Sequence, residues 1–129
     1  VEIANLLADY LGAEALITGD SLGQVSSQTI ANMALVDQAS RRPIFRPLIG
    51  FNKSEIIKLS KVVGTHDLSI LPHDDACALF APEHPIIHPE MTYVNEFITQ
   101  NNFSEDLKNA LNSAEVYSVN VKGELFKKR

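Results

Sequence analysis

The segment from Ala15 to Thr29 constrains the fold of this chain more than any other. It reads Ala-Leu-Ile-Thr-Gly-Asp-Ser-Leu-Gly-Gln-Val-Ser-Ser-Gln-Thr, an apolar run that ends in Thr-Gly-Asp and leads into residues typical of a helix start. A buried parallel strand passes to a helix in this way, and open α/β sheets bind ligands at that edge. Gly19 and Gly23 let a bound group approach the backbone, and helix-start amides attract anions. The segment predicts a nucleotide or phosphate site, while a tight turn with polar caps is the alternative.

The flanking residues alternate between helical and strand patterns. Helices are predicted over 3–11, from Ser26 or Ser27 through residue 34, and over 52–63, and strands are predicted over 15–17 and 44–48. Asn52 and Glu55 form a capping-box pattern at the start of the third helix. This order of elements predicts an α/β layer with parallel strands.

The second half of the chain has a different pattern. Prolines interrupt residues 71–89, which we predict to form a long loop, and loops of that length are commonly functional. Beyond the loop we predict helices over 93–98 and 104–111, the second capped by Ser104, and a strand over 116–121. The charges of Arg41, Arg42 and 127–129 are predicted to be solvated, and His66 is predicted to be a surface residue near a helix end.

Composition limits the classes of function. The chain has 129 residues, 45% of them hydrophobic, which is enough for one domain with a core. Its net charge of −5 argues against nucleic-acid binding by the chain as a whole. A single cysteine excludes an internal disulfide and fits a reducing compartment, so we expect a cytoplasmic protein without a membrane span. The helical pattern starts at the first residue without Met, which we interpret as part of a longer protein.

Three side chains outside the glycine turn stand out for their chemistry. Cys77 follows two acidic residues in the proline-bounded loop, and it is either a small buried hydrophobe or a reactive thiol. Lys53 lies in the first turn of its helix, where the macrodipole disfavours a cation unless an anion is near. Arg46 lies in an apolar strand and needs a partner if it is buried.

The histidines raise the possibility of a small metal-binding protein. Cys77, His84 and His88, with His73 or Asp75 as a fourth ligand, are residue types that bind zinc. Their spacing matches no strong zinc signature, and prolines separate them. We therefore predict no metal site in this loop.

Three groups of residues resemble a known family. They are Thr18-Gly19-Asp20-x-x-Gly23-Gln24-Val25-Ser26-Ser27-Gln28-Thr29, Arg46-Pro47-Leu48-x-x-x-x-Lys53-x-x-Ile56, and a Pro72-(x4)-Cys77 loop. Together they look like the tRNA 4-thiouridine synthetase family, also called the thiamine-biosynthesis tRNA sulfurtransferase family. The resemblance covers residues 1–90 and is weak beyond Met91.

The resemblance implies a fold. Residues 1–90 would be the C-terminal half of a PP-loop ATP pyrophosphatase domain of the adenine nucleotide alpha-hydrolase-like type. In this α/β fold, a doubly wound parallel sheet, here partial, is flanked by helices. Residues 91–129 would be a C-terminal helical extension with a late strand.

The resemblance also implies an activity. In the family, ATP with Mg²⁺ adenylates O4 of a tRNA uridine, and a persulfide sulfur supplied by a cysteine desulfurase or sulfur carrier then displaces AMP. Sulfur transfer by the family is also linked to thiamine biosynthesis. By position, Gly19 and Gln28 match ATP-contacting residues, Lys53 matches a lysine implicated in activation, and Cys77 matches a cysteine of sulfur transfer. The residues expected to support the ATP site are Asp20, Gln24, Ser27 and Arg46.

The chain departs from the family pattern in ways that limit these expectations. It lacks the Ser-Gly-Gly-x-Asp-Ser pyrophosphate loop, the RNA-binding region and a rhodanese-like domain, and Asp20 stands where glutamate is more usual. We therefore expect a fragment that is inactive alone and self-associates through an open sheet edge and exposed apolar surface. The alternative is a non-catalytic dimerisation or nucleotide-sensing module of the same fold.

Overall fold

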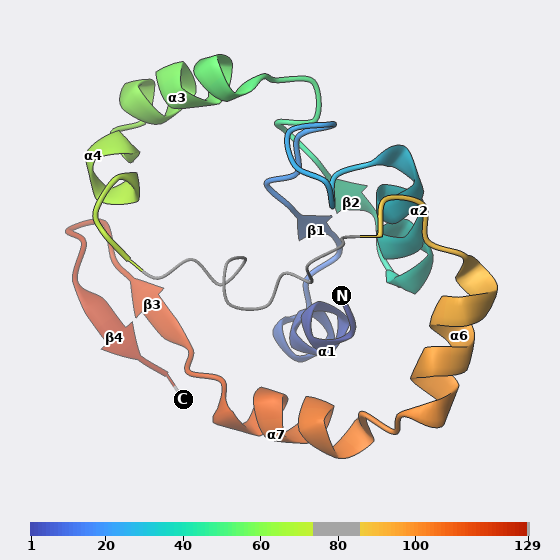
Figure 1. The fold of residues 1–129 in the computed structure, drawn as a ribbon. Helices are drawn as coiled ribbons and strands as arrows, with labels where there is room; N and C mark the ends of the chain where they lie inside the picture. Colours follow the sequence, from blue (N-terminus) through green and yellow to red (C-terminus); the bar gives the residue numbers. More distant parts are fainter. Residues whose placement is uncertain (74–85, 129) are drawn as a thin grey trace.

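The computed structural model describes residues 1–73 and 86–128 as an α/β arrangement (Figure 1). The elements are α1 (Glu2–Leu11), β1 (Leu16–Ile17), α2 (Ile30–Ala39), β2 (Ile44–Phe45), α3 (Lys53–Val62), α4 (His66–Ser69), α6 (Met91–Gln100), α7 (Ser104–Ser113), β3 (Tyr117–Val119) and β4 (Leu125–Lys127). The strands form two separate two-stranded sheets, β1–β2 and β3–β4.

The pair β1–β2 is parallel, as the order of elements predicts. Leu16 lies opposite Ile44, and the Thr18 amide continues the ladder by donating to the Phe45 carbonyl at 3.0 Å. Because the strands run in the same direction, both carboxyl ends meet at one edge, and the turn after β1 starts there. Gly19, Asp20 and Arg46, three of the residues that the sequence singles out, follow the two strands at this edge.

β2 is shorter than the predicted strand over 44–48. Pro47 has no amide to donate to a ladder, and the Ile49 amide donates to the Arg46 carbonyl at 3.1 Å, which closes a turn. The chain therefore leaves the strand at Arg46, and this residue lies at the carboxyl edge and not within the sheet.

α1 is attached to the end of α2 through Asn5. The Asn5 side chain is fully buried, its Nδ2 donates to the Ala39 carbonyl at 2.9 Å, and its Oδ1 accepts from the Arg41 amide at 3.2 Å. Leaving either buried group unpaired would cost about 1–3 kcal/mol. Asn5 thus fixes α1 against the connection that leads into β2.

Arg41 is exposed, as expected for a solvated charge, whereas Arg42 is mostly covered, contrary to the same expectation, and both are paired. Arg41 pairs with Glu2 at 2.8 Å and Asp9 at 3.3 Å, while Arg42 pairs with Asp9 and donates from Nε to the Ala13 carbonyl at 2.8 Å. The hydrogen bond from Arg42 lowers the pKa of the Asp9 carboxyl, although Asp9 itself is exposed. These ion pairs join α1 to the residues before β2.

The helix starts match the sequence prediction at α3 but not at α2 or α7. Asn52 and Glu55 form the predicted capping box of α3. α2 is capped by Thr29, whose side chain accepts from the Asn32 amide at 3.2 Å, because residues 21–28 are used in turns. Ser104 begins α7 without acting as its side-chain cap.

The C-terminal residues form an antiparallel hairpin. β3 lies within the predicted strand over 116–121, whereas β4 lies in a segment for which no strand is predicted. Asn120 holds the turn, since its Oδ1 accepts from the amides of Lys122 and Glu124, and Gly123 has a φ of 81°. Of the last charges, Lys127 is exposed and pairs with Glu115, and Lys128 is exposed, while Arg129 lies outside the described residues.

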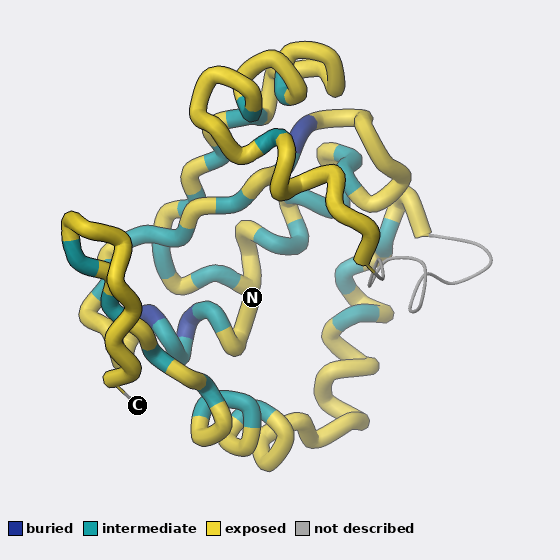
Figure 2. Tube along the Cα trace, turned by 90° about the vertical axis from the view of Figure 1, so that its left-hand side faces the viewer, coloured by how far each residue is buried: buried dark blue, intermediate teal, exposed yellow. Residues whose placement is uncertain are grey.

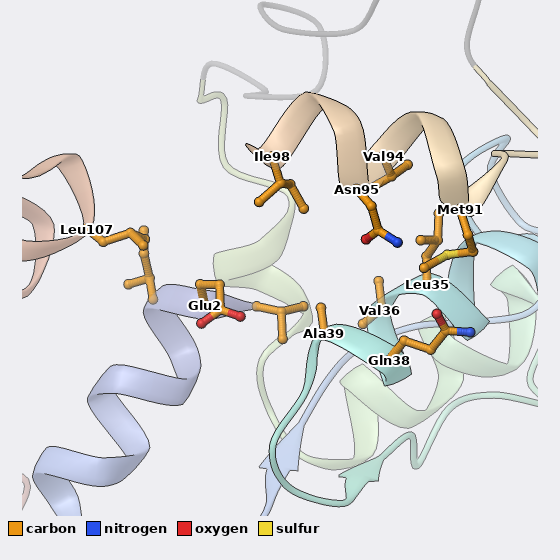
Figure 3. Close-up of a pocket in the computed structure, with 12 residues that line it drawn as sticks. Glu2, Leu35, Val36, Gln38, Ala39, Met91, Val94, Asn95, Ile98 and Leu107 are labelled. Atoms are coloured by element: carbon orange, nitrogen blue, oxygen red, sulfur yellow. The ribbon is translucent and has the colours of Figure 1, made fainter. Parts of the chain in front are cut away.

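Burial is sparse throughout the described residues (Figure 2). Ala8 is the one buried hydrophobic residue among them, and Ser21 joins Asn5 as a buried polar residue. Elements α1, α2, α6 and α7 line an open, largely apolar groove of about 650 Å³ (Figure 3). In the part of the chain that the structure describes, no helix has the length and apolar character needed to cross a membrane.

Candidate nucleotide site

The turn that follows β1 is attached to the residues between β2 and α3. The buried Ser21 hydroxyl donates to the Phe51 carbonyl, and the Leu22 amide donates to the Ile49 carbonyl at 3.0 Å. Figure 1 shows the turn after β1 beside the segment that leads into α3. These bonds bring the glycine turn next to the start of α3, two regions that the sequence separates by about thirty residues.

Gly19 and Gly23 differ in what the fold requires of them. Gly23 has a φ of 73°, a left-handed conformation that favours glycine. The φ of Gly19 is not positive, and a Cβ added there would meet no atom of the other described residues within 4 Å. The described fold therefore favours a glycine at 23 for its backbone conformation, which Gly19 does not require. The space beside both glycines is open among the described residues, so a ligand can approach the backbone there.

The segment from Gly23 to Gln28 forms a closed loop between this turn and α2. The Gly23 amide donates to the Gln28 carbonyl at 2.9 Å, and the Gln28 amide donates to the Val25 carbonyl at 2.9 Å. The Gln28 Oε1 atom is buried and accepts no hydrogen bond from the described residues. A buried unpaired acceptor is rare in proteins and indicates a donor from a ligand, water or further protein. Gln24 and Ser27 lie exposed on the same loop.

Arg46 lies beside this turn with its side chain largely covered, and it has the charged partners that such a position requires. Its side chain is 12% exposed; Nε donates to Asp20 Oδ2 at 3.1 Å, and Nη1 donates to Asp37 Oδ1 at 2.8 Å. Burial alone would lower the pKa of Arg46, but the hydrogen bonds to Asp37 and Asp20 outweigh it and raise the pKa. Sequence reasoning predicts the need for a partner but misses Asp37, because a pairing between elements leaves no local pattern.

Lys53 is the first residue of α3, as predicted, and its side chain is exposed. Among the described residues it has no hydrogen-bond or ion-pair partner, while Glu55 supplies a negative charge to the same turn. A free cation that projects from this edge can interact with an anion bound at the neighbouring glycine turn.

The segment after the proline-rich loop returns to the start of α2. Thr29 Oγ1 donates to the Ile87 carbonyl at 2.9 Å, and Asn32 Nδ2 donates to the Ile86 carbonyl at 3.1 Å. Sequence reasoning did not single out Thr29 or Asn32 for this role. Cys77, Asp75 and His84 lie outside the described residues, so the predictions for them are not tested by the structure.

The described residues do not provide a metal centre. Within residues 1–73 and 86–128, no three His, Cys, Asp or Glu side chains gather as a metal ion would require. His73 and His88 are exposed, and His66, at the start of α4 and not at a helix end, has a half-buried side chain 3.0 Å from Asp67. Asp20, the carboxylate of the glycine turn, is already paired with Arg46, so the residues described do not fit a Mg²⁺ site of their own.

Comparison with known proteins identifies the family. The model of the family described as "Thiamine biosynthesis protein (ThiI)" matches residues 1–103. The chain belongs to this family. The match includes the Thr18–Thr29 segment and the two segments after it, so the resemblance seen in the sequence is confirmed at family level.

ThiI-family relatives are similar along almost all of this chain. Proteins named "Probable tRNA sulfurtransferase" from Thermus thermophilus and Acetivibrio thermocellus are 44% identical over 123 residues and 37% identical over 119 residues. The alignments cover 95% and 92% of this chain but 30% of each relative. The chain thus spans about 30% of the length of these curated relatives.

A solved structure shares the fold of the described chain. It is that of a 4-thiouridine synthetase in a complex with RNA and bound ATP, and it superposes with a TM-score of 0.77 at 37% identity. The superposition covers 86% of this chain and 29% of that chain. This neighbour supports the α/β assignment of the fold.

Proposed function

We propose that this chain forms part of the ATP site of a tRNA sulfurtransferase, as the C-terminal half of a PP-loop domain. The observation that carries the proposal is the open turn at Gly19, at the carboxyl edge of two parallel strands and beside the first turn of α3. Ligands of open α/β sheets bind at this edge. Membership of the ThiI family supports the same function, since a solved 4-thiouridine synthetase of similar fold is described with bound ATP.

The residues at this edge suit a nucleotide. The free space beside Gly19 allows close approach to the backbone, and the unpaired Gln28 Oε1 can accept a hydrogen bond from an amino or hydroxyl group of the ligand. The Lys53 ammonium can offset negative charge on the phosphates. Asp20, Gln24, Ser27 and Arg46 support the turn on which this contact depends.

The proposed reaction has two steps, and Lys53 acts in the first. Uridine O4 of the tRNA attacks the α-phosphorus of ATP, pyrophosphate leaves, and O4 becomes bonded to AMP. Charge that develops at phosphorus is stabilised by the Lys53 cation. Adenylation makes O4 part of a good leaving group, which the later attack at C4 requires.

Cys77 acts in the second step. A persulfide sulfur carried by a second cysteine attacks C4, and AMP leaves with the oxygen. The Cys77 thiolate then attacks the sulfur of that second cysteine, which breaks its bond to the transferred sulfur, forms a disulfide and leaves 4-thiouridine. The two electrons that cleave the sulfur–sulfur bond come from Cys77.

The proposal includes partners and a division of the chain. tRNA is the substrate, and a cysteine desulfurase or sulfur carrier supplies the persulfide in the cytoplasm. Residues 1–90 belong to the PP-loop domain, and 91–129 form its helical extension with the hairpin strands. The described residues do not fit a Mg²⁺ site of their own, so the reaction above assigns no step to a metal. Since the chain spans about 30% of its relatives, we expect it to be inactive alone.

Two substitutions in the full-length protein separate the two steps. Cys77→Ser should abolish tRNA thiolation and leave ATP binding intact, because the serine hydroxyl cannot reduce a persulfide. Lys53→Ala should slow adenylation on the order of 100-fold. Lys58→Ala, an exposed lysine further along α3, is the matched control and should leave both steps at the parent rate.

Each residue assignment has an outcome that would exclude it. Undiminished thiolation by the Cys77→Ser protein would remove Cys77 from the mechanism, and adenylation at the parent rate in Lys53→Ala would remove Lys53. A full-length protein that binds ATP but modifies no tRNA would favour a nucleotide-sensing module of the same fold.

A further inference from the structure

Arg46 connects three elements around the candidate nucleotide turn. It follows β2, pairs through Nε with Asp20 in the turn after β1, and pairs through Nη1 with Asp37 in α2. Its third nitrogen, Nη2, is buried and has no partner among the described residues. An arginine whose fork joins two carboxylates fixes both in direction as well as in distance.

Asp20 is held more firmly than Asp37. Its Oδ2 atom accepts from the Thr18 hydroxyl at 2.7 Å and from Arg46 Nε at 3.1 Å, so one carboxylate oxygen is fixed from two sides. The Asp20 side chain is 28% exposed and that of Asp37 is 53% exposed. The backbone of Gly19 lies between Thr18 and Asp20, and its path is therefore fixed by these two contacts.

The charges at Arg46 exclude direct phosphate binding as its main role. One guanidinium faces two carboxylates, which leaves the cluster of Arg46, Asp20 and Asp37 with a net negative charge. The positive charge of Arg46 is therefore already neutralised by its two partners and is not available to bind a phosphate group directly. Arg46 can nevertheless act on a ligand through the carboxylate that it holds beside the open space at Gly19.

We propose that Arg46 is a positioning residue of the nucleotide site, which acts by holding Asp20 so that the turn at Gly19 presents its backbone to ATP in one conformation. The inference rests on the proposed ATP site and specifies how that site is built. The ion pair of Arg46 with Asp37 attaches the same guanidinium to α2, and Asp37 is not part of the turn. The two ion pairs of one arginine therefore differ in function.

The experiment compares the effects of removing the Asp20 and the Asp37 carboxylates, which share the Arg46 guanidinium, in the full-length protein. ATP affinity is measured by calorimetry, and thermal unfolding is followed with and without ATP. Asp20→Asn should weaken ATP binding about tenfold or more, since a charge-assisted hydrogen bond that fixes the turn is lost. Asp37→Asn is the matched control and should keep ATP affinity within about twofold. Asp20→Glu keeps the carboxylate and should restore most of the affinity.

A purely structural role for Arg46 gives a different result. It would lower the unfolding temperature of both Asn variants and leave the ATP affinity of their folded forms equal to that of the parent, which would overturn the inference. An equal loss of affinity in Asp37→Asn would also overturn it. If Asp20→Asn does not fold, Arg46→Lys decides, because one ammonium cannot reproduce the fork and should weaken ATP binding to a similar extent.

The outcome for the parent protein distinguishes this inference from the proposed function. A parent that binds no ATP overturns the ATP site and the role of Arg46 together. A parent that binds ATP, with Asp20→Asn binding equally well, overturns the role of Arg46 alone.

Discussion

Gly19 and Gly23 allow ligand contact and backbone conformation to be tested separately. Gly23→Ala places a Cβ on a residue with a φ of 73° and should destabilise the fold by about 1–2 kcal/mol. The methyl group of Gly19→Ala meets no atom of the other residues that the structure describes within 4 Å, so the unfolding temperature should not change. The same methyl group should instead obstruct ATP and weaken binding about tenfold. Thermal unfolding measures the stability of the two variants, and calorimetry measures their ATP affinity. An unchanged ATP affinity in Gly19→Ala would contradict ligand approach at this turn.

The ion pair between Asp9 and Arg42 predicts a pH dependence of stability. The hydrogen bond from Arg42 lowers the pKa of Asp9 below its ordinary value of 3.8, so protonation is less favourable in the folded state. The stabilisation is fully present above that value and is lost as the pH falls through the lower, folded-state pKa. Asp9→Asn should therefore reduce stability at neutral pH and make little difference in strong acid.

Urea unfolding of the parent and the Asn variant at both pH values measures this difference. Glu14→Gln, an exposed carboxylate with no hydrogen-bond partner among the described residues, is the control and should change stability little at either pH. An Asp9→Asn effect of equal size at neutral pH and in strong acid would contradict the assignment.

At the scale of single residues, the sequence predicts that a charged side chain requires a partner, but it does not predict which residue that partner is. Arg46 beside an apolar strand is expected to require a partner if it is buried, and it has two. Asp37 could not be chosen from the sequence, because its distance from Arg46 depends on how α2 lies against β2. The same applies to Arg42, which was expected to be solvated but is mostly covered and paired with Asp9.

At the scale of elements, α3 provides a direct test of helix capping. Asn52 Oδ1 accepts from the Glu55 amide at 3.1 Å, and Glu55 Oε2 accepts from the Asn52 amide at 2.8 Å. Asn52→Ala should cost about 1 kcal/mol of stability, since both bonds depend on this cap. Lys58→Ala on the exposed surface of α3 should remain within about 0.5 kcal/mol of the parent. Equal effects of the two substitutions in urea unfolding would contradict a capping role.

Elements with local signals were predictable, whereas those fixed by contacts at a distance were not. The capping box of α3 and the helical pattern of α1 depend on neighbouring residues, and both were predicted. The length of β2 depends on a turn that starts at Arg46, and the start of α2 depends on the turns over 21–28. β4 was missed because its residues acquire strand geometry by pairing with β3.

At the scale of the whole molecule, the exposed apolar surface predicts self-association of the chain when it is produced alone. Large hydrophobic residues such as Ile17, Phe45 and Val62 are 74%, 58% and 83% exposed, and among the described residues only Ala8 is a buried hydrophobic. Apolar surface on this scale favours association. Light scattering should show a mass above 14.2 kDa that falls on dilution. A strictly monomeric chain at all concentrations would contradict this expectation.

At the same scale, the fold brings together segments of the candidate site that are separate in the sequence. The carboxyl edge of β1–β2 gathers the turn at Gly19, the largely covered Arg46 and the start of α3, although these segments are separate in sequence. No single motif of the chain predicts this arrangement. The contribution of Cys77 depends on residues outside the described ranges and stays a prediction.

The formation of 4-thiouridine tests the central claim most directly. The full-length protein is incubated with unmodified tRNA, cysteine, a cysteine desulfurase and ATP, and the nucleosides are then analysed by mass spectrometry. The account predicts that 4-thiouridine forms with ATP, does not form without it, and does not form with the Cys77→Ser protein. Formation without ATP, or no 4-thiouridine from a folded protein that binds both ATP and tRNA, would contradict the account.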